Sequence, residues 1–218
     1  MVSRKANSSS FGRGAGQDER PSRRDARRVK PPLGEAQLRD LALHYAARFA
    51  TTAARLEAYL GRKIRERGLA EDADGRTIEV DIPALVARLV ELGYVDDDAY
   101  ARMRARDLGG RGYGARRVEE SLRHAGVGEA VRTAHAPGEA ASRRAAMLMA
   151  QKRRIGPWGN APEDPLAARK AHEKAVAAML RAGHQYDHVK VILAAARPED
   201  VEDWLAEAAT DEGMDEQW

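Results

Sequence analysis

The 218-residue sequence has no cysteine, which excludes disulfide bonds, zinc–thiolate sites and iron–sulfur clusters. Aromatic residues make up only 5% of the chain, so alanine, leucine and valine must supply most of the apolar surface. Alanine and leucine are strong helix formers. No run approaches the roughly 20 apolar residues of a membrane span, and the polar N-terminus lacks the apolar stretch of a secretory signal. We therefore expect an all-α protein that is soluble and cytoplasmic.

The formal net charge of +3 hides an uneven distribution along the chain. Residues 1–32 hold nine basic and three acidic residues, residues 33–196 hold 27 and 22, and residues 197–218 hold one and nine. A basic body can approach DNA or a nucleoprotein by electrostatic attraction. Ordinary solubility charge explains the same composition, so both interpretations stay open on charge alone.

The two ends of the chain are predicted to be charged tails. Residues 1–32 have almost no large apolar side chains, so they cannot offset the entropy of ordering, and we expect a disordered basic tail. Residues 197–218 are expected to form an acidic tail, with one short helix near Trp204 and disorder over 210–218. This tail either competes for the basic surface within the molecule or only keeps the protein soluble.

Between the tails, apolar residues recur with the spacing of one helical face. Thr51 or Thr52, Asp81 and Asp96 are expected to cap helices. The predicted helices cover residues 38–49, 53–67, 82–92, 96–108, 115–125, 128–135, 138–154, 165–182 and 186–196.

Three of these helices end alike, with IRERG at 64–68, LRHAG at 122–126 and MLRAG at 179–183. Glycine is common at helix ends, but these final glycines lie 58 and 57 residues apart, and the helix order matches. Small units of this kind bury a core by stacking on their neighbours. The sequence predicts three tandem three-helix repeats in an elongated, curved helical array, with repeats at 33–95, 96–136 and 137–196.

Three consecutive aspartates, Asp96, Asp97 and Asp98, stand in the stretch ELGYVDDDAY. Adjacent carboxylates bind metals in some proteins, but three in a row point in diverging directions, and the glycine of an EF-hand loop is missing. Before a helix, carboxylates accept hydrogen bonds from the free N–H groups of the first turn. We therefore expect these residues to start a helix at a junction between repeats.

Two glycine-containing turns are expected to shape the joints. Gly93 should end a helix, while Tyr94 and Tyr100 pack across the junction, although a surface role for either stays open. The stretch GGRGYG at 109–114 lacks the Gly-Lys-Ser/Thr ending of a phosphate loop and should supply positive φ angles in a helix–helix turn. Tyr113 in this turn is either a core anchor or an exposed contact.

His184 and His188 stand four residues apart, a spacing that zinc ligands on a helix often have. No cysteine or suitably spaced carboxylate completes the set, and no HExxH motif or nucleophile elbow is present. The sequence indicates no cofactor, no metal and no enzymatic activity.

Two clusters of basic residues are candidate contacts for a polyanion or an acidic protein groove, although a solvated helix face is the ordinary explanation. Arg102 and Arg106 share a helix face, and Arg116 lies near a helix N-terminus, where backbone N–H groups favour anions. The clusters comprise Arg102, Arg104, Arg106, Arg111, Arg116, Arg117 and Arg123, and then Lys152, Arg153 and Arg154.

Several stretches resemble the RecX family of bacterial regulatory proteins. They are LxxLGYVDDDAYA at 89–101, GxGYGARRVxxxL at 110–122, AGV at 125–127, QKRRIGPW at 151–158 and LRAGH at 180–184. The resemblance covers roughly residues 38–196 and leaves both charged tails outside. The stretch EDADGRT at 71–77 and the acidic tail depart from the family pattern.

The resemblance implies tandem three-helix repeats and a monomer that binds the RecA recombinase filament on single-stranded DNA. It also implies inhibition of the ATPase, strand-exchange and coprotease activities of RecA. A basic face would meet the filament, and it maps here onto Arg102, Arg106, Arg111, Arg116, Arg117, Lys152, Arg153 and Arg154. The alternative is an autonomous protein that binds single- or double-stranded DNA through tandem helix-turn-helix-like units.

Overall fold

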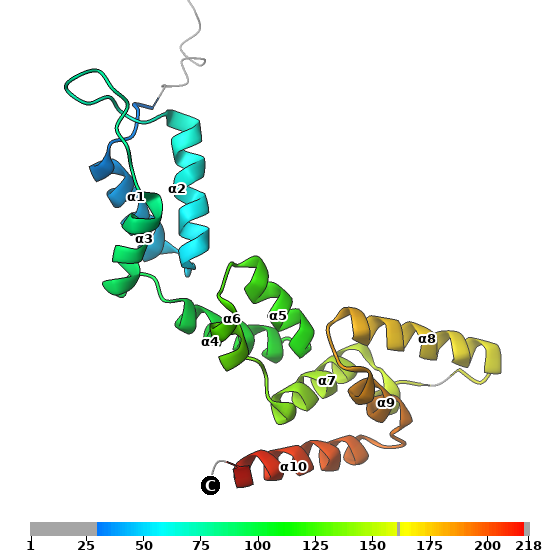
Figure 1. The fold of residues 1–218 in the computed structure, drawn as a ribbon. Helices are drawn as coiled ribbons and strands as arrows, with labels where there is room; N and C mark the ends of the chain where they lie inside the picture. The colour runs from blue at the N-terminus through cyan, green and yellow to red at the C-terminus, as the bar shows by residue number, and fades with distance from the viewer. Residues whose placement is uncertain (1–29, 161, 216–218) are drawn as a thin grey trace, which may run out of the picture. The chain divides into compact units, whose positions relative to one another are not determined.

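The computed structural model describes residues 30–160 and 162–215, and within them the chain is all-α, with no β-strand (Figure 1). This confirms the predicted fold class. The predicted disorder of residues 1–29 and 216–218 lies outside the described residues. The helices are α1 (Glu35–Arg48), α2 (Ala53–Arg67), α3 (Ile82–Glu91), α4 (Asp97–Gly110), α5 (Ala115–His124), α6 (Glu129–Ala134), α7 (Glu139–Arg153), α8 (Pro165–Arg181), α9 (Tyr186–Ala194) and α10 (Pro198–Asp215), with a 3-10 turn, η1, at Gly156–Trp158.

The side-chain caps that the sequence predicts for α2, α3 and α4 are present. Thr52 accepts a hydrogen bond from the backbone of Arg55 at 3.3 Å. Asp81 and Asp96 accept equivalent bonds in the first turns of α3 and α4, at 2.9 Å and 2.8 Å. Such caps satisfy backbone donors that have no partner within the helix, and each is worth about 1 kcal/mol.

The glycine-rich turn differs in part from the prediction. Gly112 has a positive φ of 86°, as expected, but Gly109 and Gly110 belong to α4. The helix continues through them because the backbone N–H of Arg111 still reaches the carbonyl of Asp107. The turn between α4 and α5 is therefore shorter than the four-glycine stretch indicates.

Buried side chains form three hydrophobic clusters, one for each set of successive helices. The N-terminal cluster lies among α1–α3, the middle cluster among α4–α6, and the C-terminal cluster among α7–α10. Their fully buried members include Leu56 and Leu60, Leu122, and Met179 with Ile192. Each cluster has only seven to nine buried residues. Cores this small gain stability when their neighbours cover them.

A close backbone approach joins the N-terminal and middle clusters. A Cβ added at Gly126, after α5, would lie 2.3 Å from the Cβ of Ala54 at the start of α2. Beside it, the hydroxyl of Thr52 donates to the carbonyl of Ala125. Asp97 accepts a hydrogen bond from the backbone N–H of Ala53 at 2.9 Å. The N-terminus of α2 is thus satisfied by α4 and by the end of α5.

The middle and C-terminal clusters are joined in the same way. Gly183, after α8, has a φ of 93°, and a Cβ there would lie 2.5 Å from the backbone nitrogen of Arg117 in α5. The N–H groups of Gly114 and Arg116 donate to the carbonyls of Ala182 and Gly183, at 3.0 Å and 3.2 Å. In both joints, an alanine–glycine helix end contacts the first turn of a helix in the preceding cluster.

The acidic C-terminal segment is more ordered than predicted. A single helix, α10, extends to Asp215 and packs along α7 (Figure 1), so the expected disorder from residue 210 is wrong for the residues described. Val201 and Ala208 are buried, and the guanidinium of Arg143 lies 4.6 Å from the ring centroid of Trp204. These apolar residues share one helical face, and α7 covers that face.

Candidate functional site

The predicted basic residues differ in whether a carboxylate neutralises them. Arg102, Arg111 and Arg117 form exposed ion pairs with Asp98, Asp107 and Glu120. Exposed pairs contribute little to stability, so they exchange readily for an external anion. Within the described part of the chain, the other arginine side chains of the set have no ion pair or hydrogen bond; they are Arg106, Arg116, Arg153 and Arg154. Lys152 donates to the carbonyl of Gly110 at 3.3 Å.

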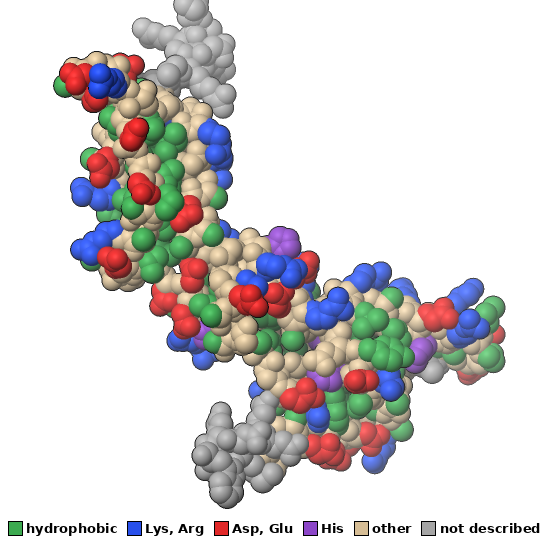
Figure 2. All heavy atoms as spheres, viewed as in Figure 1, with side chains coloured by type: hydrophobic (Ala, Val, Ile, Leu, Met, Phe, Trp, Pro, Cys, Tyr) green, Lys and Arg blue, Asp and Glu red, His purple; other side chains and the backbone are tan. Residues whose placement is uncertain are grey.

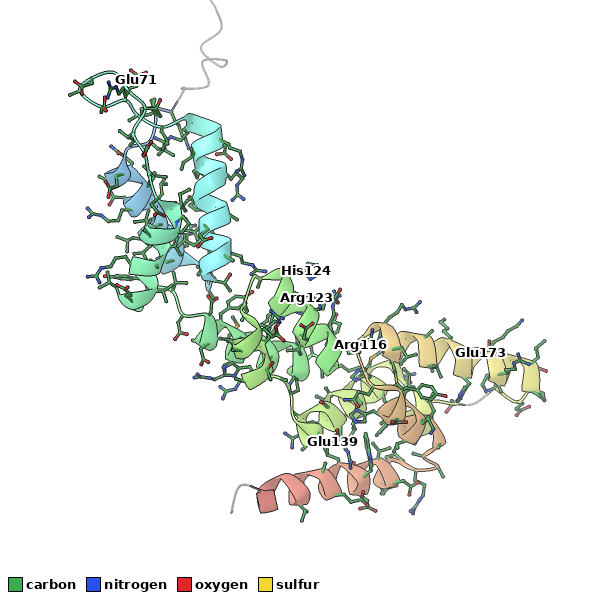
Figure 3. The ribbon with its side chains drawn as sticks, in the orientation of Figure 1. Glu71, Arg116, Arg123, His124, Glu139 and Glu173 are labelled. Carbon is green, nitrogen blue, oxygen red and sulfur yellow. The ribbon has the colours of Figure 1, made fainter. Side chains whose placement is uncertain are left out.

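A hollow of about 310 Å³ lies where α4 and α5 meet the start of α2, and we call it the arginine hollow. Its arginines are Arg55, Arg104, Arg111 and Arg117. Basic side chains, a histidine and acidic side chains lie together over α5 on the face shown in Figure 2. In Figure 3, Arg116 stands at the start of α5, and Arg123 and His124 stand at its end.

Contacts with neighbouring side chains orient the arginines of this hollow. Arg55 lies over the ring of Tyr100, at 5.3 Å from its centroid, and donates to its hydroxyl. Arg104 donates to the hydroxyl of Ser121 at 2.9 Å and pairs with Asp107 at 3.0 Å. These side chains come from residues far apart in the sequence, so Arg55 was not among the predicted contacts.

The arginine hollow has more basic than acidic side chains in its lining, and these affect the carboxylate within it. The hydrogen bond from Arg117, with the nearby positive charges, lowers the pKa of Glu120 below its usual value. Glu120 is therefore ionised at neutral pH and offsets part of the arginine charge.

The remaining predicted residues lie in two other places. Arg106 and Arg144 line a hollow of about 290 Å³ between α4 and α7, and half of its lining residues are alanine or glycine. Arg153 and Arg154 line a larger groove of about 860 Å³ beside α8. The structure thus distributes the predicted set over several surfaces and does not gather it into one site.

The three aspartates of the junction each contact a different element. Asp96 caps α4, and Asp97 contacts the first turn of α2. Asp98 accepts a hydrogen bond from His135, after α6, at 2.8 Å and pairs with Arg102. The hydrogen bond with His135 and the pair with Arg102 lower the pKa of Asp98 below its usual value. Asp96 and Asp97 therefore hold the start of α4 and its contact with the preceding cluster.

The tyrosines near the two joints have distinct environments. Tyr100 is 7% exposed and packs in the middle cluster, but Tyr94 is 57% exposed, which favours the surface role that the sequence left open for it. Gly93 turns the chain with a φ of 75°, and Val95 takes the buried position. Tyr113 is half-buried and packs against both the middle and the C-terminal cluster, which favours the anchoring role.

The two histidines of the zinc-like spacing are buried with separate partners. His184 donates from Nε2 to the carbonyl of Gly112 at 3.1 Å, and burial lowers its pKa. His188 donates to Glu139 at 3.1 Å and meets the ring of Trp204 edge-on. Residues 30–160 and 162–215 contain no group of three or more His, Asp or Glu that could hold a metal. They also contain no helix long and apolar enough to cross a membrane.

These features define an all-α protein with small helical clusters and hollows lined by basic side chains. No family model matches the sequence. The regulatory protein RecX of Myxococcus xanthus (strain DK1622) is 31% identical over 178 residues, which cover 79% of this chain and 94% of the relative. The crystal structure of RecX from Lactobacillus salivarius matches with a TM-score of 0.54 at 17% identity, over 72% of this chain and 93% of that one. The chain belongs to the RecX family of regulatory proteins, which are not enzymes.

Proposed function

We propose that this protein binds the RecA recombinase filament on single-stranded DNA and inhibits the ATPase, strand-exchange and coprotease activities of RecA. Family membership carries the proposal, because the similarity to a RecX protein extends over 94% of that relative. The protein would act as a cytoplasmic monomer.

The three hydrophobic clusters support an arrangement of three tandem repeats, at 33–95, 96–136 and 137–196. The two joints support it further, because each places an alanine–glycine helix end on the first turn of a helix in the preceding cluster. Stacked repeats form extended surfaces suited to a long partner, and an elongated, curved array follows from continued stacking.

The unneutralised arginines support a cationic contact with the filament. Arg106, Arg116, Arg153 and Arg154 have no carboxylate partner among the described residues. Nucleic acid and acidic protein surfaces attract such groups and accelerate encounter. The arginine hollow adds Arg55 to the candidate contacts, as well as Arg104.

The test is ATP hydrolysis by purified RecA on single-stranded DNA with increasing amounts of this protein. We expect hydrolysis to fall as the protein reaches stoichiometric excess, and full activity at that point contradicts the proposal. The double variant Arg116→Glu/Arg153→Glu should require about tenfold more protein for half-inhibition. Arg88→Glu is the matched control, because Arg88 is an exposed residue of α3 outside the predicted contacts.

The alternative, autonomous DNA binding, predicts a different result. Salt-sensitive binding to naked DNA, with no effect on RecA hydrolysis, would favour it.

A further inference from the structure

A groove of about 860 Å³ lies between α8 and the segment from the end of α7 to η1. We call it the α8 groove. It lies in the C-terminal cluster and is separate from the arginine hollow. Its lining combines an apolar floor with basic side chains.

The floor is an alanine stripe on α8, composed of Ala168, Ala171, Ala175 and Ala178. Residues at this spacing share one helix face, and the stripe is about 15 Å long at 1.5 Å per residue. Ile155 and Leu193 extend the apolar lining. Small side chains let a second helix approach closely, so this surface suits helix packing.

Packing within the chain covers this face of α8 only in part, because Ala175 and Ala178 pack against the C-terminal cluster while Ala168 is half-buried and Ala171 is exposed. Met179 is the only fully buried residue assigned to the helix, although α8 extends over 17 residues. The alanine–glycine helix ends at Gly126 and Gly183 contact the first turns of α2 and α5, respectively. In the described residues, no such helix end reaches the first turn of α8.

The ionisable side chains that line the groove are all basic. The α8 groove is lined by Arg153, Arg154, Arg169, His172 and Lys174, and by no aspartate or glutamate. Figure 2 shows basic side chains along α8. Glu173, the carboxylate that pairs with Arg169 at 2.9 Å, projects from α8 (Figure 3) and is not part of the lining.

Arg154 gives a second indication that its side chain has a use in the α8 groove. It is the one non-glycine residue with positive φ in the described chain, with φ 53° and ψ 52°. Glycine is the favoured residue at this position after a helix. An arginine here carries a backbone cost that glycine would avoid, and its side chain has no ion pair or hydrogen bond within the described chain.

We propose that the α8 groove binds an acidic amphipathic helix of a protein partner. The apolar face of such a helix would lie on the alanine stripe, and its carboxylates would meet Arg153, Arg154 and Lys174. This mode of binding is common for amphipathic helices. A single-stranded nucleic acid fits less well, because its bases stack best on large aromatic rings, and no phenylalanine, tyrosine or tryptophan lines the groove.

This inference rests on the proposed function for the identity of the partner. It refines that function by assigning the α8 groove to protein contacts. Its own test does not require RecA. The probe is a fluorescent peptide of about 18 residues, long enough for five helical turns, with leucines on one face and glutamates on the other. Its anisotropy is measured with the full-length protein.

We expect saturable binding of this peptide, and much weaker binding of a scrambled peptide or one with lysines in place of glutamates. Ala171→Glu should weaken binding at least about tenfold, because it places a carboxylate opposite those of the peptide. Ala177→Glu is the matched control, since Ala177 is an exposed residue of α8 outside the lining. Circular dichroism checks that both variants keep their helices.

Equal binding of the three peptides, no binding at all, or equal effects of the two substitutions would overturn the inference. A fluorescent single-stranded oligonucleotide that binds the groove in place of the peptide, with the same sensitivity to Ala171→Glu, would also overturn it. Peptide binding without any effect on RecA hydrolysis would instead count against the proposed function alone.

Discussion

Substitution of Gly183 by alanine tests the joint between the middle and C-terminal clusters. Gly183 has a φ of 93°, and its added Cβ would lie 2.5 Å from the backbone nitrogen of Arg117 and 2.8 Å from the Cβ of that residue. The left-handed conformation costs a non-glycine residue about 1–2 kcal/mol. Overpacking against the backbone lowers the free energy of unfolding by a further amount of about 1–3 kcal/mol. Alanine also lowers the entropy of the unfolded chain, which raises the free energy of unfolding by about 0.4–1 kcal/mol. Together these contributions give a net loss of about 1–5 kcal/mol in the free energy of unfolding.

Two other glycines separate these contributions. Gly93 has a positive φ of 75°, but no atom lies within 4 Å of its added Cβ, so Gly93→Ala should cost only the conformational part, about 1 kcal/mol. Gly109 lies inside α4 and is also free of close neighbours, so Gly109→Ala should stabilise the protein by about 0.5–1 kcal/mol.

Urea unfolding of the three variants, followed by circular dichroism at the helix band, gives the free energies of unfolding. The predicted order of stability is Gly109→Ala, then wild type, then Gly93→Ala, then Gly183→Ala. If Gly183→Ala is no more destabilising than Gly93→Ala, the close approach at the joint is not present in solution.

Three further predictions concern single side chains. Because burial lowers the pKa of His184, the folded state binds fewer protons than the unfolded state below the ordinary value of 6.5. The free energy of unfolding should therefore fall as the pH falls below 6.5, by at most about 1.4 kcal/mol per pH unit, and His184→Gln should reduce this slope in urea titrations at several pH values. Arg154→Gly should raise the free energy of unfolding by about 0.5–1 kcal/mol, and it should weaken binding of the acidic peptide. Glu120→Gln should strengthen binding of a single-stranded oligonucleotide, measured by anisotropy, because Arg117 loses its competing carboxylate.

Each of these three predictions has a clear contrary result. An unchanged pH slope in His184→Gln would mean that another group controls the acid sensitivity. If the Arg154→Gly variant is less stable than the wild type, the positive φ of Arg154 does not destabilise the protein. Weaker oligonucleotide binding by Glu120→Gln would show that the carboxylate orients Arg117 for its ligand and does not compete with it.

The helices and caps were predictable because their signals are local. Thr52, Asp81 and Asp96 each contact a backbone donor within three residues, so sequence spacing alone indicates the cap. Helix α10 extends beyond its predicted end because it packs along α7, where Trp204 meets Arg143, and a local sequence pattern does not contain such a contact.

The parts of the candidate site that depend on distant contacts were not predictable. Asp97 looks like a second cap, but its partner is the backbone of Ala53, 44 residues away. Arg55 has no basic neighbour in its own helix turn, and only the fold brings it to Tyr100 and the arginine hollow. Whether an arginine is neutralised also depends on which carboxylate lies beside it in space.

Binding to an assembled filament tests the central proposal most directly. RecA is assembled on single-stranded DNA with a non-hydrolysable ATP analogue, and fluorescently labelled protein is titrated in, with bound protein measured by co-sedimentation. We predict saturable binding to the filament, weakened in Arg116→Glu/Arg153→Glu and unchanged in Arg88→Glu. No binding above that to DNA alone, or equal binding by both variants, would contradict a cationic contact with the recombinase filament.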